Sequence, residues 1–509
     1  MGDLSKLKIA VGQPELVCGR ASANEIARER MVERAVDVGA DLLVMPGSLE
    51  DAHDVHLVVL NDSRIDVAGN AVHLDACGET YRIGLSPDDM TCDFAVYSDV
   101  RPWTLDAGGI RQDPMRFVPT IVLRPVGMRN AGKSVYAYDG GTKVFGADGA
   151  VIAALRDDFE EDVSLVQFSE GNRIQDPCDD KLLAALVKTL RRFDEQVLPW
   201  NPKWIIGLSG GLDSSVVAVL LTLAFGADRV LGYNMATRFN TDATKSNAAD
   251  IADALGISLR SGSIEDLVDA TGSTLSHYGY ADDAMSGLVL ENVQARVRGH
   301  LLSTFAAVEG GVVVNNGNRV EAALGYATLY GDAIGALAPI GDLTKVRLFS
   351  LAHAINGDRK NAIIPENLLP RMTDEGYEWI TPPSAELADG QRDPMKWFYH
   401  DWLIDKLLDG ADVDSAACEV MEHYLSDRLS TSEVSKWVRF YGLDAPQAFA
   451  DDFAWVLGSM RKSAFKRIQA PPTIRLASQA SIAVPEEVQG EREPSQRFKS
   501  LEASIRSLS

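Results

Sequence analysis

Short apolar runs in the middle of the chain alternate with longer segments in which apolar positions recur every three or four residues. Such runs predict buried strands, and the longer segments predict amphipathic helices. The elements expected in this order are a helix at 181–196, a strand at 204–206, a helix at 216–225, a strand at 229–235 and a helix at 243–255. Alternating strands and helices indicate a doubly wound α/β domain, whose ligands bind beyond the carboxyl ends of the strands.

The first 168 residues follow a different order. A strand at 7–13, a helix at 23–38 and a strand at 41–46 are followed by strands at 81–85, 93–97 and 120–123 and by a hairpin from 138 with its turn at Asp148-Gly149. The spacing of Ser22 and Glu25 predicts a capping box at the start of the helix. A strand, a helix and then many strands are typical of an α/β layered sandwich.

Polar stretches suggest where the domains divide. Residues 158–162 and 170–180 are rich in Asp, Glu and Gln and include a proline, which favours a linker, and residues 484–509 are polar and rich in Pro, Gln and Glu. We therefore expect a first domain at 1–168, a linker at 169–180, a second domain at 181–482 and a loosely ordered polar tail at 483–509.

Composition narrows the class of protein. At 509 residues the chain is too long for one hydrophobic core. Its net charge of −24, from 49 basic and 73 acidic residues, disfavours broad contact with a nucleic acid. No apolar run approaches the roughly 18 residues that span a bilayer. We recognise no leader segment. Five widely spaced cysteines without a Cys-x-x-Cys pair argue against disulfides or a zinc site. We therefore expect a cytoplasmic protein without a membrane or nucleic-acid partner.

The stretch from Ser209 to Ser215, which reads Ser-Gly-Gly-Leu-Asp-Ser-Ser, joins an apolar run to a helix. Its glycines let a phosphate approach the backbone, and the helix start presents unpaired N–H groups and a positive dipole end. The hydroxyls add donors, and Asp213 is an oxygen ligand suited to magnesium. No Gly-Lys-Ser/Thr follows, so the stretch is not a Walker P-loop. It predicts a phosphate-binding loop, and the alternative is an ordinary Gly-rich turn.

Further polar residues lie beyond other predicted strands. Asn292 and Arg296 are four apart on one helix face, as are Gln294 and Arg298, which suits a polar, charged ligand or an exposed helix surface. Glu321 follows the strand at 312–314 by one helical turn. Arg238 lies beyond the strand at 229–235, where it is either a nucleotide contact or a surface charge.

The loop from Ser209 resembles the pyrophosphate-binding loop of the ATP pyrophosphatases, also described as adenine nucleotide alpha hydrolase-like. Later segments make the resemblance narrower. In order along the chain they are 291–299, 315–321, 325–332, 338–345, 382–387 and 465–472. Together they are similar to NAD synthetases of the large, two-domain bacterial kind. The similarity is specific over 181–480 and loose over 1–168.

This resemblance implies ATP as co-substrate, Mg²⁺ as cofactor and deamido-NAD as substrate. Asp213, Lys345 and Glu321 would be catalytic, with Asp213 and Glu321 holding the metal. The implied ATP site comprises Ser209, Gly210, Gly211, Asp213, Ser214, Ser215, Arg238, Asn316, Lys345 and Ser384. The implied deamido-NAD site comprises Asn292, Arg296, Tyr326, Asp332 and Lys466. Ser384 and Asp393 would belong to a mobile loop. The family builds the dinucleotide site across a dimer interface, so a homo-oligomer of at least two chains is expected.

The first domain is similar in layout to the nitrilase-type amidase domain fused to glutamine-dependent NAD synthetases. That domain uses a Glu-Lys-Cys triad, and here the position of the glutamate is Gly47. The strand ending near Leu85 runs into Ser-Pro-Asp-Asp, with no cysteine at the position where the family has one, and no lysine occurs from residue 9 to residue 132. Cys92 is expected to be a buried, inert thiol. We therefore expect a nitrilase-like sandwich without glutaminase activity.

The implied reaction converts deamido-NAD to NAD through an acyl adenylate, with ammonia as the amine source. One alternative is a glutamine-hydrolysing synthetase that uses unrecognised amidase residues. Another is an ATP pyrophosphatase that amidates or thiolates a different acceptor such as tRNA, which would call for a basic face and catalytic cysteines. A third is a non-catalytic assembly or regulatory protein derived from the family. The retained Asp213, Glu321 and Lys345 argue against the third.

Overall fold

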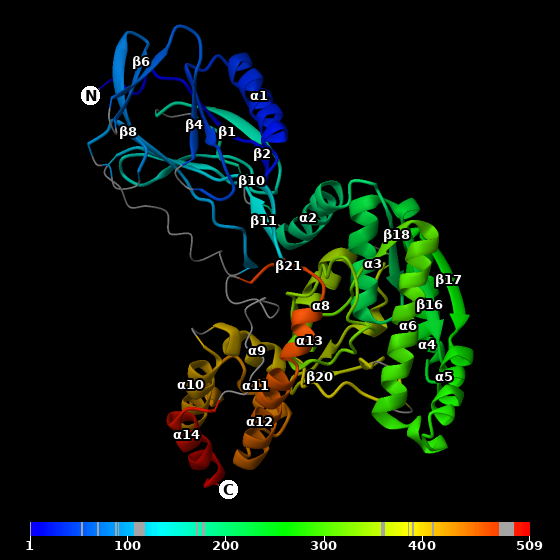
Figure 1. The fold of residues 1–509 in the computed structure, drawn as a ribbon. Helices are drawn as coiled ribbons and strands as arrows, with labels where there is room; N and C mark the ends of the chain where they lie inside the picture. Colours follow the sequence, from blue (N-terminus) through cyan, green and yellow to red (C-terminus); the bar gives the residue numbers. More distant parts are fainter. Residues whose placement is uncertain are drawn as a thin grey trace. The chain divides into compact units, whose positions relative to one another are not determined.

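The computed structural model describes residues 2–51, 54–68, 71–86, 89, 91–105, 118–168, 172–175, 178, 180–357, 362–384, 386–388, 391–409, 412–477 and 493–508. The chain divides into two compact units, Met1–Ala131 with Val135–Val197 and Gly132–Ser134 with Leu198–Ser509 (Figure 1). Both units mix helices and strands, which confirms the expected α/β class. Among the described helices, none is long and apolar enough to pass through a membrane.

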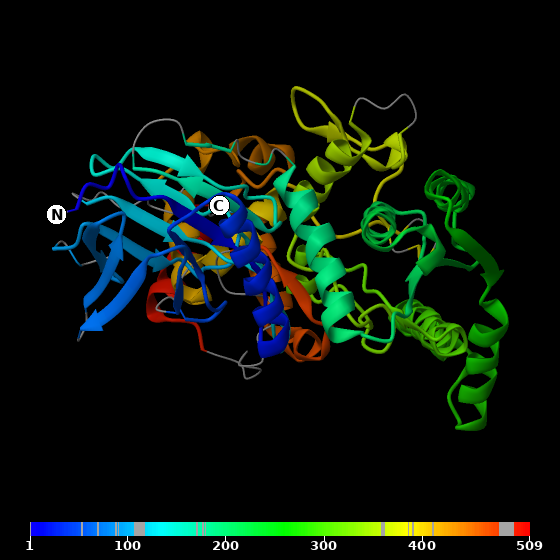
Figure 2. The same cartoon turned by 90° about the horizontal axis from the view of Figure 1, so that it is seen from above.

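The first sheet of unit one has the strand order β14-β1-β3-β4. Strand β1 (Ile9–Gln13) runs parallel to β3 (Leu42–Pro46), and β14 (Asp162–Val166) and β4 (Val55–Val59) pair antiparallel at either side. Helix α1 (Ala21–Asp37) lies against this sheet (Figure 2). Its Met31 and Ala35 share a buried cluster with Ala10 and Leu43 of the strands. One face of the sheet is thereby covered by a helix.

A second sheet covers the other face. Its order is β13-β12-β9-β8-β7-β6-β5. The strands are β5 (Arg64–Ala68), β6 (Ala71–Ala76), β7 (Glu79–Gly84), β8 (Phe94–Ser98), β9 (Thr120–Leu123), β12 (Lys143–Phe145) and β13 (Val151–Ala154). One core joins both sheets, because Ile9 and Val44 of the first pack with Phe94 and Ile121 of the second. The α/β sandwich expected for the first domain is confirmed.

Helix α1 begins earlier than the sequence suggests. Its first residue is Ala21, and Arg20 occupies the cap position without a side-chain cap hydrogen bond. The expected capping box at Ser22 and Glu25 is wrong because both residues already lie inside the helix. Glu25 instead pairs with Arg28 across 3.0 Å.

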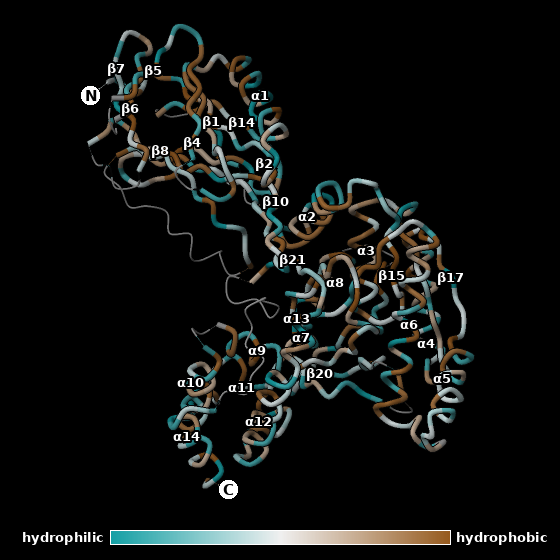
Figure 3. The backbone as a smooth tube through the Cα atoms, in the orientation of Figure 1, coloured by the Kyte–Doolittle hydropathy of each residue, from teal (hydrophilic) through white to brown (hydrophobic). Residues whose placement is uncertain are grey.

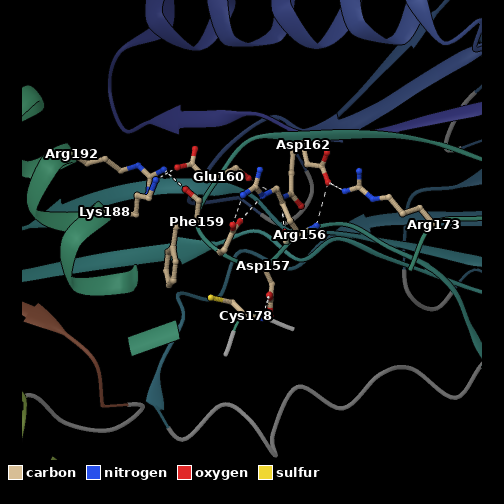
Figure 4. Close-up of polar contacts among 11 residues, drawn as sticks. Arg156, Asp157, Phe159, Glu160, Asp162, Arg173, Cys178, Lys188 and Arg192 are labelled. Carbon is tan, nitrogen blue, oxygen red and sulfur yellow. Dashed lines mark hydrogen bonds and ion pairs between the residues drawn. The ribbon is translucent and has the colours of Figure 1, made fainter. Parts of the chain in front are cut away.

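The segment 158–162, expected to be a linker, is part of unit one. Asp162 begins β14, and polar side chains hold the loop that precedes it (Figure 4). Arg192 of α2 (Lys181–Val197) donates to the Phe159 carbonyl at 2.6 Å, and Lys188 of the same helix pairs with Glu160. A charged sequence here reflects ion pairing rather than a solvated connection.

Helix α2 contacts β10 (Val126–Ala131), which lies between β2 (Glu15–Val17) and β11 (Ser134–Asp139). The helix itself agrees with the expected 181–196. It belongs to unit one, so the structural division falls after Val197 rather than after residue 180. Residues 169–171, 176, 177 and 179 of the expected linker lie outside the described residues. The functional boundary at 180/181 stays a prediction.

Unit two is built on a parallel sheet of order β17-β16-β15-β18. Its strands are β15 (Lys203–Gly207), β16 (Val230–Ala236), β17 (Ser258–Ser263) and β18 (Gly311–Val313). Trp204 stacks on Phe225 of α3 (Leu212–Phe225), whereas Ile205, one residue on, packs with Leu302 and Ala306 of α6 (Gly287–Glu309). Successive strand residues point to opposite faces, so α3 and α6 cover opposite faces. This is the expected doubly wound arrangement.

The remaining helices near the sheet are α4 (Asp242–Leu255), closed by Gly256 in the left-handed region, and α5 (Glu265–His277). The chain passes from edge strand β17 through α5 and α6 to β18, which returns beside β15. The direction of winding reverses at β15 and β18. The carboxyl ends of these two strands therefore form the switch point where α/β sheets bind ligands.

A helical layer follows the sheet in sequence. It comprises α7 (Arg319–Leu324), α8 (Lys345–Asn356), α9 (Tyr399–Asp409), α10 (Val413–Leu425), α11 (Ser435–Phe440), α12 (Pro446–Lys462), α13 (Ala464–Gln469) and α14 (Gln496–Arg506). Two short strands, β19 (Arg371–Met372) and β20 (Tyr377–Glu378), pair before α9, and β21 (Thr473–Arg475) follows α13. By contrast, α3 of the sheet region is largely apolar and buried, and its backbone is coloured brown in Figure 3.

The C-terminal tail is not uniformly loose. Helix α14 contacts α10 and α12, and its Phe498 and Ile505 are buried in the core that these helices share. The expectation of loose order is wrong for 496–506, because two apolar residues seven apart give this polar stretch one buried face. The other part of the expected tail, 483–492 and Ser509, lies outside the described residues.

Candidate functional site

The loop from Ser209 connects β15 to α3 at the switch point. Gly211 caps α3 with extended backbone, and Gly210 has φ +84°. A Cβ at Gly210 would lie 1.9 Å from the Thr244 carbonyl oxygen of α4, so only glycine fits there. The Ser209 hydroxyl accepts from the Gly211 N–H at 3.2 Å and lies 3.1 Å from the Ser214 hydroxyl. The loop is a preformed turn with its hydroxyls gathered at the start of a helix.

The opposite wall begins at the end of β18. The Asn316 amide donates to the Gly207 carbonyl at 2.9 Å and thereby joins the ends of both switch-point strands. Asn318 and Glu321 form a capping box at α7: the Asn318 side chain accepts from the Glu321 N–H, and Glu321 accepts from the Asn318 N–H at 3.2 Å. This reciprocal capping fixes Glu321 in one orientation.

Lys345 is the first residue of α8 and is only 3% exposed. Its ammonium lies 2.5 Å from Asp213 Oδ2 and 5.3 Å from the centre of the Trp397 ring. Burial acts to lower the pKa of Lys345, but Asp213 and Glu321 outweigh it and hold that pKa above its ordinary value. A buried lysine is thus kept charged by two carboxylates.

Glu321 has the complementary electrostatics. Burial raises the pKa of its carboxyl well above the usual range, and the nearby charge of Asp213 adds to the rise, while Lys345 opposes it. Two carboxylates beside one ammonium leave the cluster short of positive charge. A cation brought by a ligand would correct that shortage.

These groups line one cavity of about 480 Å³. The sequence-predicted site residues that line it are Ser209, Gly211, Asp213, Ser214, Asn292, Asn316, Glu321, Tyr326, Asp332, Lys345, Ser384, Asp393 and Lys466. They come from strand ends, from α3, α6, α7, α8 and α13, and from loops far apart in the sequence. The structure therefore brings together thirteen residues that were selected from sequence alone.

Four of the expected residues do not line the cavity. Gly210 packs against α4, and Ser215 is buried with its hydroxyl donating to the Gly211 carbonyl at 2.5 Å. The Arg238 side chain is 61% exposed and lies 4.0 Å from Glu265. Arg296 is exposed and donates to the Leu329 carbonyl at 3.3 Å.

Arg298 lines the cavity; its helix face was noted as suited to a charged ligand, but the residue was not assigned to the ATP or deamido-NAD site. Its Nε donates to the Met235 carbonyl at 3.1 Å, and burial lowers the pKa of its guanidinium to about 10. Helical spacing carries the signal that finds it: Glu291, Ala295, Arg298 and Leu302, at intervals of three and four, all line the cavity.

A second missed residue is Glu386, in the segment that follows two prolines. Its carboxylate accepts hydrogen bonds from Asn240 at 2.7 Å, from Thr241 at 3.1 Å and from Thr244 at 3.0 Å, all at the start of α4. The neighbouring Leu387 carbonyl accepts from Gln294 at 2.9 Å. This segment, which carries Ser384, is thus fastened over the cavity at two points.

The residues present fit a magnesium ion. Asp213 Oδ1 is buried and has no hydrogen-bond partner in the part of the chain that the structure describes. Among those residues no group of three or more His, Cys, Asp or Glu is placed to hold a metal alone. Two carboxylates with an open oxygen suit a hard cation that takes its other ligands from phosphates and water.

Gly47 and Cys92 are the residues of unit one that the comparison with amidases singles out, and both lie in its described part. A Cβ at Gly47 would lie 2.2 Å from Asp54 Oδ1, so Asp54 fills the space of a larger side chain. Cys92 is 2% exposed and donates to the Asp89 carbonyl, and burial raises the pKa of its thiol. The expected burial of Cys92 is confirmed, and its inertness stays a prediction.

Solved structures of similar fold are known. A glutamine-dependent NAD(+) synthetase from Cytophaga hutchinsonii has a TM-score of 0.69 at 15% identity, over 98% of this chain and 99% of that chain. A glutamine-dependent NAD+ synthetase from Acinetobacter baumannii, in complex with ADP, has a TM-score of 0.60 at 18% identity, over 93% and 96%. At such identities the likeness shows the fold alone.

Curated relatives are closer in sequence. A glutamine-dependent NAD(+) synthetase from Synechocystis is 32% identical over 296 residues, which are 54% of this chain and 47% of that protein. One from Thermotoga maritima is 30% identical over 302 residues, 59% of this chain and 46% of that protein. The chain thus spans about half the length of these curated relatives.

A family model described as NAD synthase matches residues 187–441. The matched region contains the switch-point strands, the loop from Ser209, the α6 face with Asn292 and Arg298, and the Asp213–Glu321–Lys345 cluster. It amounts to half of the 509-residue chain. The chain therefore belongs to the NAD synthase family.

Proposed function

We propose that the chain is an NAD synthetase, which converts deamido-NAD to NAD at the expense of ATP. The observation that carries the proposal is the buried ammonium of Lys345, held 2.5 Å from Asp213 beside the phosphate-type loop. A cation kept charged at the floor of a cavity is suited to a polyphosphate whose negative charge increases during reaction. The family relationship supports the same substrates.

The ATP site lies, in this proposal, at the switch point formed by the carboxyl ends of β15 and β18. Ser209, Gly211 and Ser214 present hydroxyl and backbone donors to the phosphates, and Lys345 neutralises the leaving pyrophosphate. Asn316 Oδ1 is buried without a partner in the described residues, so it is free to accept from an N–H of the ligand. Asp213 and Glu321 would hold magnesium. When bound, the metal would neutralise phosphate charge and orient the phosphates.

The deamido-NAD site is the wall formed by residues 325–332. Lys466 donates to the Gly325 and Ala327 carbonyls at 2.8 and 2.7 Å, and Asp332 accepts from the Thr328 N–H at 2.6 Å. Asn292 accepts from the Thr328 hydroxyl at 2.8 Å. These contacts support an ordered wall with the Tyr326 ring in the cavity. Arg296 would reach the dinucleotide only across a homodimer interface, and that role and the oligomer stay predictions.

The nicotinate carboxylate is a poor electrophile, so the reaction must first activate it. The nicotinate carboxylate attacks the α-phosphorus of ATP, the bond to the β-phosphate oxygen breaks, and pyrophosphate leaves. Ammonia then attacks the acyl adenylate carbonyl, loses a proton, and displaces AMP to leave the amide. The chain holds both substrates in line, stabilises the departing charge through Lys345, and covers the cavity with the segment around Ser384 to exclude water.

We propose ammonia as the amine source. Gly47 in place of a glutamate, the absence of lysine from residue 9 to residue 132, and the buried Cys92 support a unit one without amidase activity. Burial and the adjacent Glu50 raise the pKa of the Cys18 thiol, so this exposed cysteine is a poor nucleophile as well.

The second candidate is glutamine-dependent synthesis, because the relatives from Synechocystis and Thermotoga maritima are named glutamine-dependent. The test follows NAD formation from deamido-NAD, ATP and magnesium with ammonium or glutamine. Turnover with ammonium alone supports our proposal. Turnover with glutamine that a Cys18→Ser or Cys92→Ser variant abolishes, while ammonium turnover remains, supports the second candidate. Failure with both amines contradicts the synthetase function.

A further inference from the structure

Besides the residues that line the cavity, one short segment, 397–401, packs against the start of α8. Trp397 is 2% exposed, and its ring centre lies 5.3 Å from the Lys345 ammonium. Asp401 is 4% exposed, and its Oδ1 accepts from the Val346 N–H at 2.9 Å. Two side chains of this segment thus contact the first turn of the helix that begins with Lys345.

Helix α8 lacks a cap of its own. Thr344 occupies the cap position but makes no side-chain cap hydrogen bond. Asp401 takes over that role, since the N–H of Val346, the second residue of α8, is one of the unpaired donors at a helix start. A buried carboxylate beside these donors also complements the positive end of the helix.

The same carboxylate starts a second helix. Asp401 Oδ2 accepts from the Phe398 N–H at 3.0 Å, and Asp401 is the third residue of α9. One side chain therefore joins the beginnings of α8 and α9. The Trp397 carbonyl is fixed in turn by the Tyr441 hydroxyl at 3.1 Å, and the Phe398 ring stacks on Trp437 at 4.2 Å. The segment has little freedom to move away from Lys345.

Two groups attract the lysine. Asp213 pairs with the ammonium, and the face of the Trp397 indole ring also attracts the cation. Without the ring and the helix cap, the flexible lysine stem could swing away from Asp213.

We propose that Asp401 and Trp397 are positioning residues, which act through Lys345 to hold its ammonium where the pyrophosphate departs. The inference rests on the proposed function for its kinetic consequence but not for its geometry. A group displaced by about 1 Å from its productive position can lose on the order of 100-fold in rate.

The kinetic test uses Asp401→Ala, Trp397→Leu and Trp397→Phe in the full-length chain. We expect the first two to lower kcat with ammonium by about 10- to 100-fold, with the KM for deamido-NAD changed less than about twofold. Trp397→Phe, which keeps an aromatic face, should retain most of the activity. The matched control is Asp412→Ala, which removes the side-chain cap of α10 at Ser415 and leaves the site untouched.

A second measurement reads the position of Lys345 without activity. Reductive methylation followed by mass spectrometry should label Lys345 slowly in the wild type and at least about tenfold faster in Asp401→Ala and Trp397→Leu, but not in Asp412→Ala. Unchanged labelling overturns the inference. Faster labelling with normal kcat also overturns it, because the position would then not matter. If wild-type protein forms no NAD, the proposed function fails, and the labelling alone decides whether these residues hold Lys345.

Discussion

Gly210 illustrates how one residue shapes the phosphate loop. Its φ of +84° and the 1.9 Å separation between an added Cβ and the Thr244 carbonyl oxygen leave room for no side chain. The residue does not line the cavity, yet it lets the loop pack on α4 and so places the Ser209 and Ser214 hydroxyls.

We therefore expect Gly210→Ala to lower the free energy of unfolding by at least about 1–3 kcal/mol and to raise the KM for ATP. Chemical denaturation and steady-state kinetics measure the two effects. Gly262→Ala is the control, because a Cβ there meets nothing within 4 Å and φ is not in the left-handed region. Equal effects of the two substitutions would contradict the packing argument.

The sequence motifs predicted which residues belong near the site, but they did not predict which side chains line the cavity. Asp213, Glu321 and Lys345 were identified from short motifs and do meet in space. Arg238 and Arg296 were identified in the same way but face away from the cavity, whereas Arg298 enters it. Spacing of four places two residues on one helix face, but only the packing of α6 on the sheet decides which face meets the ligand.

Among the elements, the segment around Glu386 lines the cavity and is bonded to the start of α4. Its carboxylate accepts from three side chains at the start of α4, and Glu386 itself has φ +49°. A hydrogen bond to a charged group contributes about 1.5–3 kcal/mol to stability. This one side chain thus supplies three of the hydrogen bonds that hold the segment against α4.

Glu386→Ala should release this segment, so that its amide hydrogens exchange faster and the KM for ATP rises by about tenfold, with little change in the midpoint of global unfolding. Hydrogen-exchange mass spectrometry of peptides around 382–388 gives the first readout. Glu386→Gln retains an acceptor and should show a smaller effect. Exchange that is unchanged in the alanine variant would show that the contacts with α4 do not hold the segment.

Helix α14 is the element whose order the polar composition concealed. Phe498 and Ile505 pack into the core that α10 and α12 share, and they are 6% and 1% exposed. Only two apolar residues of the helix are fully buried, which is too weak a pattern to stand out among polar neighbours.

Phe498→Ala should destabilise the helical layer by about 3–5 kcal/mol, because it leaves a cavity in a closed core. Urea denaturation followed by far-UV circular dichroism provides the value. Leu508→Ala, at a residue that is 61% exposed, should change it by less than about 0.5 kcal/mol. A small effect at Phe498 would indicate that α14 does not contribute to the core.

For the whole molecule, strand and helix periodicity was enough to predict two α/β units, because each strand of β15, β16 and β18 is an apolar run. The boundary was harder to predict. Helix α2 is amphipathic whichever unit it covers, and its assignment depends on long-range ion pairs such as Arg192 with Glu15. Charged loop residues at 158–162 likewise suggested solvent exposure, but their partners lie far away in sequence.

The two units lead to different expectations for the reaction. Unit two gathers a phosphate-type loop, two carboxylates and a buried ammonium around one cavity. In unit one, Gly47 stands where the resemblance places a glutamate, and Cys92 is a buried thiol. We therefore attribute the synthetase reaction to unit two and expect no supply of ammonia from glutamine by unit one.

The most direct test measures NAD and AMP formed by the full-length chain from deamido-NAD, ATP and magnesium, in parallel with ammonium chloride and with glutamine. Our account predicts equal amounts of NAD and AMP with ammonium, no NAD with glutamine alone, and loss of the ammonium reaction in Lys345→Ala. Absence of NAD with ammonium, despite a folded protein that binds ATP, would contradict the account.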